Sequence, residues 1–459
     1  MIETIDPTTG TTIECIPLMN EQQIDAKLEA AFTRARHWGA ASLDERGALL
    51  RAVAARMLSE RDSLAATAVR EMGKPIVQAR AEVEKCVWAL EYFAEHAAAM
   101  LAAQNAPSAA ARSYVAFRPL GVLLAIMPWN FPYWQVVRAA APALIAGNTM
   151  LLKHAANTTR CALELERIFA DAGAPKGLFG VLVARGEGID KLVGDPRIAA
   201  VTLTGSERAG VAVACAAGEA LKKCVLELGG SDAFVVFDDA DLDAAARTAV
   251  RARFQNNGES CIAAKRFVVE SRVYDDFLSR FVAFAAEQVV GNPMDEHVAL
   301  GPCAREDLRA TVNEQVRATL DAGARLALGG KALGRPGFFY EPTVVADVVP
   351  GTRMFDEEVF GPAAAVVRAK DREHALALAN ASSFGLGSSL WTRDVAAAEA
   401  IARRVEAGAV FINGLVASDP RLPFGGVKRS GYGRELSAFG IHEFVNIQTV
   451  WIGPLTARD

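Results

Sequence analysis

Short apolar runs typical of strands alternate with amphipathic runs typical of helices between residues 113 and 228. The strand-like runs are Ser113–Arg118, Leu120–Met127, Thr149–Lys153, Leu178–Ala184, Ala199–Thr204 and Lys223–Leu228, and the helical runs are Thr158–Ala172, Ile189–Gly194 and Ser206–Ala217. Parallel strands need long crossover connections, which are usually helices. The alternation therefore predicts an α/β fold built on a parallel, doubly wound sheet.

The segments on either side extend this pattern. Helical periodicity predicts helices over Asn20–Trp38, Asp44–Met57, Asp62–Met72 and Pro75–Leu101. Residues 104–112 are small and polar, as in a linker, and a second α/β run extends from Ala233–Phe237 through Ala409–Asn413. The tail Phe444–Ile452 is strand-like, and a terminal strand is often tied into a sheet, which favours an oligomer.

Composition excludes several classes of function. The 459 residues are 51% hydrophobic, enough for two domains, and the net charge of -5 with no long basic run argues against nucleic acid or an anionic membrane as a partner. The N-terminus lacks the pattern of a secretory signal, and the longest apolar stretch is too short to span a bilayer. Seven scattered cysteines without metal-type spacing indicate a reducing cytoplasm and no metal site.

One cysteine follows a polar turn that contains glycine. Cys261 comes directly after Gln255-Asn256-Asn257-Gly258-Glu259-Ser260 and before a strand-like run that begins near Arg266. Gly258 permits backbone conformations that a Cβ forbids, so the turn can present a thiol at the edge of a cleft. Taken alone, a free cysteine is more often a small buried hydrophobe.

Two further polar residues stand at the ends of apolar strands. Asn130 lies in the turn Pro128-Trp129-Asn130-Phe131-Pro132, where two prolines restrict the backbone around the amide. Glu227 ends an apolar strand just before Gly229-Gly230, and a partly buried carboxylate there would have the raised pKa of a general base. Taken alone, an asparagine in a turn is more often structural, because turns favour Asn for local reasons, and Glu227 is equally compatible with a surface position at a strand end.

Two other stretches are suited to binding an anionic cofactor. At Thr204-Gly205-Ser206 a strand meets a helix, and the exposed backbone N–H groups of such a junction can hold a pyrophosphate. The ordinary G-x-G-x-x-G fingerprint of dinucleotide binding is absent from the sequence. Glu357-Glu358-Val359-Phe360-Gly361-Pro362 is a polar and aromatic turn with no evident local purpose.

Together, and in this order, these motifs resemble the aldehyde dehydrogenase superfamily over essentially the whole chain. The resemblance implies that Cys261 is the nucleophile, Glu227 the general base and Asn130 the oxyanion donor. It also implies cofactor-binding positions at Met127, Trp129, Lys153, Ala156, Gly205, Ser206, Leu228, Glu358 and Phe360. Glu259 departs from the family, which often has Gln there, and is expected to alter the charge near the thiol.

The same resemblance implies a domain organisation. A parallel-sheet cofactor-binding domain is expected over 1–111 and 122–226, and an α/β catalytic domain over 227–420. Residues 112–121 and 440–459 are expected to form a small strand-based oligomerisation flap, in a homodimer or homotetramer.

Within the superfamily the chain is most similar to bacterial NAD(P)-dependent succinate-semialdehyde dehydrogenases. The segments Met72-Gly73-Lys74-Pro75 and Arg429-Ser430-Gly431-Tyr432-Gly433-Arg434-Glu435 are among those that carry this similarity. It implies that the substrate contacts are Trp134, Arg138, Gln255, Ser418 and Phe424, with Arg138 and Ser418 binding the substrate carboxylate. Some members have a second arginine where this chain has Gln255.

The expected reaction is oxidation of succinate semialdehyde, or a similar small semialdehyde, to the free acid through a thiohemiacetal and a thioester on the cysteine. NAD-preferring relatives often carry Glu where this chain has Ala156, and a small neutral residue permits NADP, so the cofactor is NAD or NADP. Three alternatives stay open: a broad-specificity dehydrogenase of aromatic or medium-chain aldehydes, a catalytically silent relative, and a cysteine hydrolase.

Overall fold

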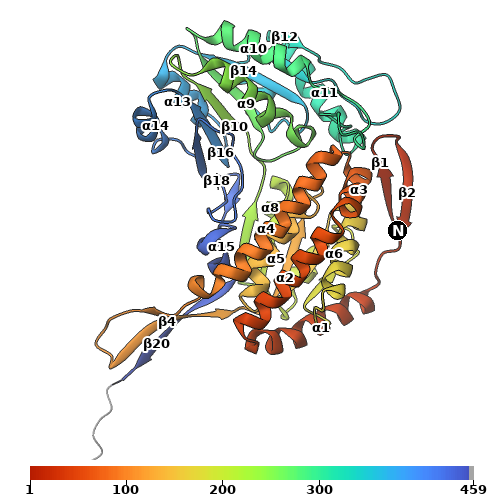
Figure 1. Ribbon diagram of the computed structural model, residues 1–459, viewed down its shortest axis with the longest axis vertical. Coiled ribbons are helices and arrows are strands. Elements are labelled where there is room, and N and C mark those ends of the chain that lie inside the picture. The colour runs from red at the N-terminus through yellow and green to blue at the C-terminus, as the bar shows by residue number, and fades with distance from the viewer. Residues whose placement is uncertain (454–459) are drawn as a thin grey trace, which may run out of the picture.

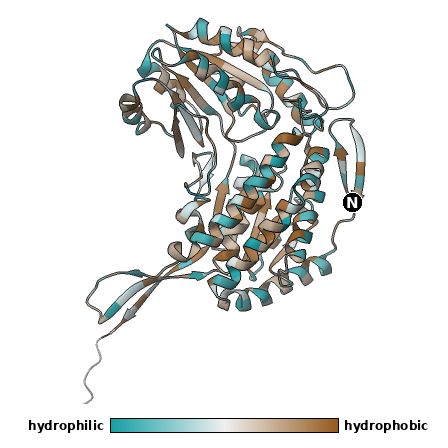
Figure 2. Cartoon of the chain, viewed as in Figure 1, coloured by the Kyte–Doolittle hydropathy of each residue, from teal (hydrophilic) through white to brown (hydrophobic). Residues whose placement is uncertain are grey.

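The computed structural model describes residues 1–453 and shows two lobes and a projecting ribbon (Figure 1). One lobe contains the N-terminal helices and a six-stranded sheet, and the other contains a seven-stranded sheet with its own helices. The outer helices alternate polar and apolar residues along their length (Figure 2). The α/β fold expected from the alternating pattern is confirmed.

The six-stranded sheet has the order β19-β9-β8-β5-β6-β7. Its strands are β5 (Val122–Met127), β6 (Thr149–His154), β7 (Phe179–Val181), β8 (Ile198–Thr204), β9 (Lys223–Glu227) and β19 (Gly431–Tyr432). β5 to β9 are parallel, as predicted, but β19 returns from the C-terminal part of the chain and pairs antiparallel with β9. The order reverses between β5 and β8, and ligands of open α/β sheets bind at such a switch point.

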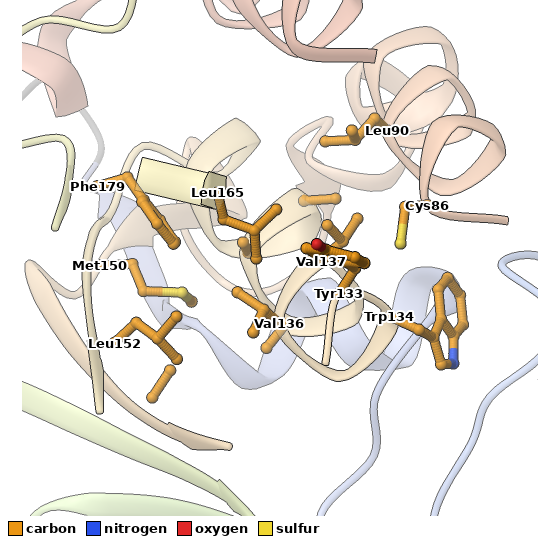
Figure 3. Close-up of a cluster of buried hydrophobic side chains, with 14 of the residues drawn as sticks. Cys86, Leu90, Tyr133, Trp134, Val136, Val137, Met150, Leu152, Leu165 and Phe179 are labelled. Atoms are coloured by element: carbon orange, nitrogen blue, oxygen red, sulfur yellow. The ribbon is translucent and has the colours of Figure 1, made fainter. Parts of the chain in front are cut away.

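Helices cover this sheet and build the larger hydrophobic core. They are α1 (Glu21–Ala40), α2 (Leu43–Ser59), α3 (Arg61–Met72), α4 (Ile76–Met100), α5 (Trp134–Ile145), α6 (Thr159–Asp171), α7 (Ile189–Gly194), α8 (Glu207–Glu219) and the 3-10 turn η1 (Ala156–Thr158). α1 begins with a capping box in which Asn20 and Gln23 bond to each other's backbone N–H. In Figure 3, Val137 of α5 lies toward Leu90 of α4 and Val136 toward Leu152 of β6, and every residue of α5 is buried.

The seven-stranded sheet has the order β12-β13-β14-β11-β10-β16-β17 and is parallel except for β12. Its strands are β10 (Asp232–Val236), β11 (Ala264–Glu270), β12 (Arg325–Leu328), β13 (Thr343–Ala346), β14 (Ala363–Ala369), β16 (Gly387–Trp391) and β17 (Ala409–Ile412). Its helices are α9 (Leu242–Phe254), α10 (Tyr274–Ala286), α11 (Glu306–Asp321), α12 (Arg353–Asp356), α13 (Arg372–Asn380) and α14 (Val395–Ala402). Separate apolar clusters on the two faces of this sheet form the core of the lobe.

The projecting ribbon is a three-stranded antiparallel sheet of order β20-β4-β3. β4 (Arg112–Pro119) pairs with β20 (Val445–Ile452) from Val445↔Pro119 to Ile452↔Arg112, and β3 is Gln104–Asn105. Two details differ from the sequence expectation: residues 104–105 are part of this sheet instead of a linker, and Ser437–Glu443 is a helix, α15. The end of the expected flap, residues 454–459, lies outside the described residues.

Smaller elements complete the chain: the hairpin β1 (Ile2–Asp6) and β2 (Thr11–Ile16), the pair β15 (Phe384–Gly385) and β18 (Val427–Lys428), and the 3-10 turn η2 (Gln255–Gly258). Within residues 1–453, no helix combines the length and the apolar character needed to cross a membrane. The same residues contain no group of three His, Cys, Asp or Glu side chains arranged to hold a metal ion.

Candidate active site

A strained turn presents Cys261. Asn256, Asn257 and Gly258 have φ angles of 54°, 60° and 75°, all in the left-handed region that Gly and Asn tolerate best. A Cβ on Gly258 would lie 2.4 Å from the Gly361 carbonyl oxygen, so only glycine fits. The expectation that this position needs glycine is therefore confirmed, for a reason of close approach as well as of backbone angle.

Hydrogen bonds from buried side chains hold the turn. Asn257 Nδ2 donates to the carbonyl oxygens of Gly73 and Pro302, both at 2.9 Å. Arg253, buried on α9, donates to the Gly258 carbonyl at 2.5 Å and to the Ala264 carbonyl at 3.0 Å. These bonds tie the turn to both lobes, so the cysteine is positioned by groups far away in sequence.

Lys265 fixes the backbone of the cysteine itself. Its Nζ donates to the carbonyl oxygens of Ser260 at 2.8 Å and of Cys261 at 2.5 Å. Burial raises the pKa of the Cys261 thiol to about 11, while the cationic Arg138 and Lys265 oppose that rise. The thiol form therefore predominates at neutral pH, and an approaching substrate or base must favour the thiolate.

A cavity of about 470 Å³ opens beside Cys261. Each of the five residues expected to contact substrate lines it: Trp134, Arg138, Gln255, Ser418 and Phe424. They come from α5, from the turn before Cys261 and from the loop after β17. Sequence segments separated by nearly 300 residues thus meet around one thiol.

The Asn130 amide lies against the turn that presents Cys261. Its Nδ2 donates to the Glu259 carbonyl at 3.1 Å, and its own carbonyl accepts from Asn256 Nδ2 at 2.9 Å. An amide nitrogen carries two N–H donors, so one bond to Glu259 leaves a second donor for a ligand. Asn130 is 3% exposed and is therefore held in a fixed orientation.

Glu227 is buried at the end of β9, but it does not line the cavity beside Cys261. Burial, followed by the nearby Glu435 carboxylate, raises the pKa of Glu227 well above its usual range, and Arg138 and Arg434 oppose this rise. Neither carboxylate oxygen of Glu227 has a hydrogen-bond partner among the described residues. Because its pKa is raised and no hydrogen bond occupies its oxygens, the ionised form of Glu227 is a stronger base than an exposed carboxylate.

Arg138 has a partner that the sequence did not predict. Its guanidinium forms an ion pair with Glu435, donates to Thr204 Oγ1 at 3.2 Å and lies 4.6 Å from the centre of the Phe424 ring. Both members of the ion pair are almost completely buried. Glu435 lies in the Arg434-Glu435 segment that carried the similarity to a family branch, but nothing in that segment indicated which arginine it meets.

A second buried ion pair holds the start of α5. Glu82 on α4 accepts the backbone N–H of Tyr133 at 2.8 Å and of Trp134 at 2.9 Å, and forms an ion pair with Lys74. A carboxylate at a helix N-terminus satisfies unpaired N–H groups and favours the helix dipole. Lys74 and Glu82 therefore set the direction in which α5 presents Trp134 and Arg138.

The expected cofactor positions gather at the switch point of the six-stranded sheet. Met127 ends β5, and Gly205 follows β8. Ser206 is the N-cap of α8 and its Oγ accepts from Ala209 at 3.4 Å, which confirms the predicted cap. Lys153 is the penultimate residue of β6, and burial alone lowers its pKa, with no contribution from any acid in the described part of the chain.

The other expected cofactor residues approach from both lobes. Trp129 and Phe360 meet edge to face with ring centres 5.6 Å apart. Glu358 accepts from the Gly230 N–H at 2.9 Å and lies 3.7 Å from Lys265 Nζ. Leu228 is buried, whereas Ala156 is exposed in η1.

Glu259 does not place a charge beside the thiol as its sequence position suggested. It is fully buried, and its Oε1 accepts the Ala304 N–H at 2.9 Å. Burial raises the pKa of Glu259 well above the usual range, which favours the neutral acid. The residue supports the turn as a neutral group.

Comparisons with known proteins show which family the chain belongs to. Residues 1–450 match the aldehyde dehydrogenase family. The chain is 50% identical over 447 residues to the succinate semialdehyde dehydrogenase [NAD(P)+] of Escherichia coli strain K12, covering 97% of each chain. It is 49% identical over 454 residues to succinate-semialdehyde dehydrogenase [NADP(+)] 1 of Mycobacterium tuberculosis strain H37Rv, covering 98% of this chain and 99% of the relative.

Solved structures have the same fold over the full length. The succinic semialdehyde dehydrogenase of Streptococcus pyogenes, in complex with NADP+, superposes with a TM-score of 0.97 at 36% identity, covering 99% of this chain and 100% of that one. A match over 450 residues and identities near 50% across almost the whole length far exceed what a shared fold alone produces. The chain is therefore a member of the aldehyde dehydrogenase family.

Proposed function

We propose that this protein oxidises succinate semialdehyde, or a similar small semialdehyde, to the free acid with NAD or NADP. The observation that carries the proposal is the cavity in which Cys261 faces the cationic residues Arg138 and Lys85. A semialdehyde has an aldehyde that can react with the thiol and a carboxylate that can bind to the cationic side chains. The names of the relatives in Escherichia coli and Mycobacterium tuberculosis support the same substrate.

Cys261 supplies the nucleophile. Its sulfur, as thiolate, adds to the aldehyde carbon and forms a hemithioacetal. The oxygen that gains negative charge in this step needs hydrogen-bond donors, and the second N–H of the Asn130 amide is one such donor. Because Asn130 is fixed by the turn before Cys261, this donor is in place before the substrate binds.

Glu227 supplies the base for the second half of the reaction. Loss of hydride from the hemithioacetal carbon leaves a thioester on Cys261, which water must cleave to release the free acid. Glu227, whose burial raises its pKa, takes the proton from that water. From its position with Arg138 and Glu435, the side chain must rotate toward the cavity to do so, and this rotation breaks no hydrogen bond to the described residues.

The residues at the switch point fit a nicotinamide dinucleotide, which accepts the hydride when it is bound. Lys153 is a half-buried cation without an acidic partner in the described residues, as expected for a group that binds ribose hydroxyls or a phosphate. A Cβ on Gly229 would lie 2.4 Å from Glu358 Oε2, so glycine is needed to hold that carboxylate at the site. The N-terminus of α8 after Gly205, where the cap residue Ser206 is exposed, suits a pyrophosphate.

A substrate panel tests the function. Steady-state kcat/KM is measured for succinate semialdehyde, butanal and benzaldehyde, each with NAD and with NADP. We expect the highest value for succinate semialdehyde. Equal or higher values for the two neutral aldehydes would favour a broad-specificity dehydrogenase, and no reduction of either nicotinamide would refute an oxidoreductase.

We further propose that the protein works in the cytoplasm as a homodimer or homotetramer. The seven cysteines are all unpaired, which suits a reducing compartment. β20 exposes Ile447 and Trp451 on one face of the projecting ribbon and Ile452 on the other, apolar side chains that a second copy can cover. Light scattering after size exclusion measures the subunit number, and a monomer at micromolar concentration would contradict the proposal.

A further inference from the structure

The cavity beside Cys261 contains two cationic side chains that differ in how their charge is compensated. Arg138 on α5 is paired with Glu435. Lys85 on α4 forms no ion pair with any acid among residues 1–453. Its Nζ donates to Ser418 Oγ at 2.7 Å and lies 4.6 Å from the centre of the Trp134 ring. Neither a hydroxyl nor an indole ring carries the charge that would neutralise an ammonium group.

Two carboxylates lie near Lys85, but each has another partner. Glu82, on the same helix, accepts two backbone N–H groups at the start of α5 and pairs with Lys74. Asp419, in the loop after β17, accepts from Arg421 at 2.9 Å and 2.6 Å. Both carboxylates near Lys85 therefore form their hydrogen bonds and ion pairs with other groups.

The remaining neighbours do not supply negative charge. Arg138 faces Lys85 from α5 and disfavours its charged form, and the Cys86 thiol beside it on α4 is buried and neutral. Burial, followed by Arg138, lowers the pKa of Lys85 to about 8. An ammonium group that is costly to keep charged, and that faces a cavity, is well placed to bind an anion.

We propose that Lys85, held by Ser418 over Trp134, binds the distal carboxylate of the semialdehyde and determines the preference for carboxylate-bearing aldehydes. The inference rests on the function proposed above. Because the Ser418 oxygen accepts from Lys85, its own O–H is free to donate to the second carboxylate oxygen. Lys85 and Ser418, which lie side by side in the lining of the cavity, thus form a two-donor site for one carboxylate while Arg138 remains paired with Glu435.

Four forms of the enzyme test this role: the wild type, K85M, K85R and the control K331M. Met is close to Lys in length and shape but has no charge, and Lys331 is exposed and distant from the cavity. Loss of a charged hydrogen bond should lower kcat/KM of K85M for succinate semialdehyde about 10- to 100-fold, mainly through KM. The value for butanal, which has no carboxylate, should change little, and K85R should keep more of the preference than K85M.

The pH dependence of the wild type is a second measurement that needs no variant. The ratio of kcat/KM for succinate semialdehyde to that for butanal should fall as pH rises through about 8, because Lys85 loses its proton. Titration of Cys261 affects both aldehydes and cancels in the ratio. K85R, whose guanidinium stays charged, should show a ratio that does not vary over this range.

The outcomes separate this inference from the proposed function. A wild type without preference for succinate semialdehyde over butanal would refute both. A wild-type preference that persists in K85M, or equal losses of K85M on the two aldehydes, would overturn the role of Lys85 and leave the proposed function standing. A wild-type ratio that does not change with pH would overturn it too, even if K85M failed to fold.

Discussion

Replacing Arg138 with methionine tests the buried ion pair behind the active site. The guanidinium and the Glu435 carboxylate are both almost fully buried, and Glu227 lies close enough for its pKa to respond to both. The sequence suggested that loss of Arg138 would impair only substrates with a carboxylate. The ion pair changes that expectation, because R138M leaves an uncompensated negative charge in the protein interior.

The size of the effect follows from the burial of both partners. Removing one member of a buried ion pair costs about 3–5 kcal/mol, because the other charge stays buried without compensation. R138M and E435Q should therefore each be destabilised by about this amount, whereas the double variant R138M/E435Q, which leaves no unpaired buried charge, should be less destabilised than either single variant. In R138M, kcat/KM should fall for butanal as well as for succinate semialdehyde.

Thermal unfolding midpoints and inactivation half-lives rank the stability of the wild type, R138M, E435Q and R138M/E435Q. The wild type should be the most stable, the double variant intermediate and the two single variants the least stable. Because Arg138 lowers the pKa of Glu435, its removal raises that pKa further above the unfolded value. A carboxyl with a raised folded pKa destabilises the folded protein as pH rises, so the deficit of R138M should shrink at acidic pH and grow toward neutral pH.

Two results would refute this reasoning. Single variants as stable as the wild type would mean that the pair contributes nothing to the folded state. A double variant with the summed loss of the two single variants would mean that Arg138 and Glu435 act independently.

Three further variants address the reaction itself. C261A should abolish aldehyde oxidation while nicotinamide binding, followed by fluorescence quenching, stays intact; residual oxidation would mean another nucleophile. E227Q should give a rapid burst of NAD(P)H followed by turnover that is roughly 10²–10⁴-fold slower, and normal turnover in the steady state would exclude Glu227 as the essential base. G258A should be less stable and much less active, since a Cβ would lie 2.4 Å from the Gly361 oxygen at a φ of 75°; wild-type thiol labelling and activity would show that the turn tolerates a side chain.

Local patterns in the sequence were sufficient for the architecture of the chain. The positions of α1 to α4 and of β5, β6, β8 and β9 agree with the predicted ranges to within a few residues, because each has a clear period of apolar residues and a capping or turn residue at its end. Two-residue strands such as β3 and β19 were missed. Such strands have no period of their own and exist only because a longer strand offers unpaired backbone groups.

The sequence also determined which residue types are available at the candidate site. The turn before Cys261, the proline-bounded Asn130 and the strand-terminal Glu227 were each recognisable from neighbouring residues, because the chemistry of a turn or a strand end is local. Their roles in catalysis are still predictions. Their arrangement around the thiol came only with the fold.

Only the tertiary structure decided how the charges pair. Arg138 and Glu435 are separated by almost 300 residues, and Lys85 and Ser418 by 333, so no local pattern could indicate that they meet. The same holds for Glu82 of α4, which accepts backbone N–H groups at the start of α5. A charged side chain has the same local sequence signature whether it faces water, an ion-pair partner or a cavity, because burial is set by packing between distant segments. That is why the sequence identified the arginine near the thiol, while the structure identified the lysine whose charge has no partner.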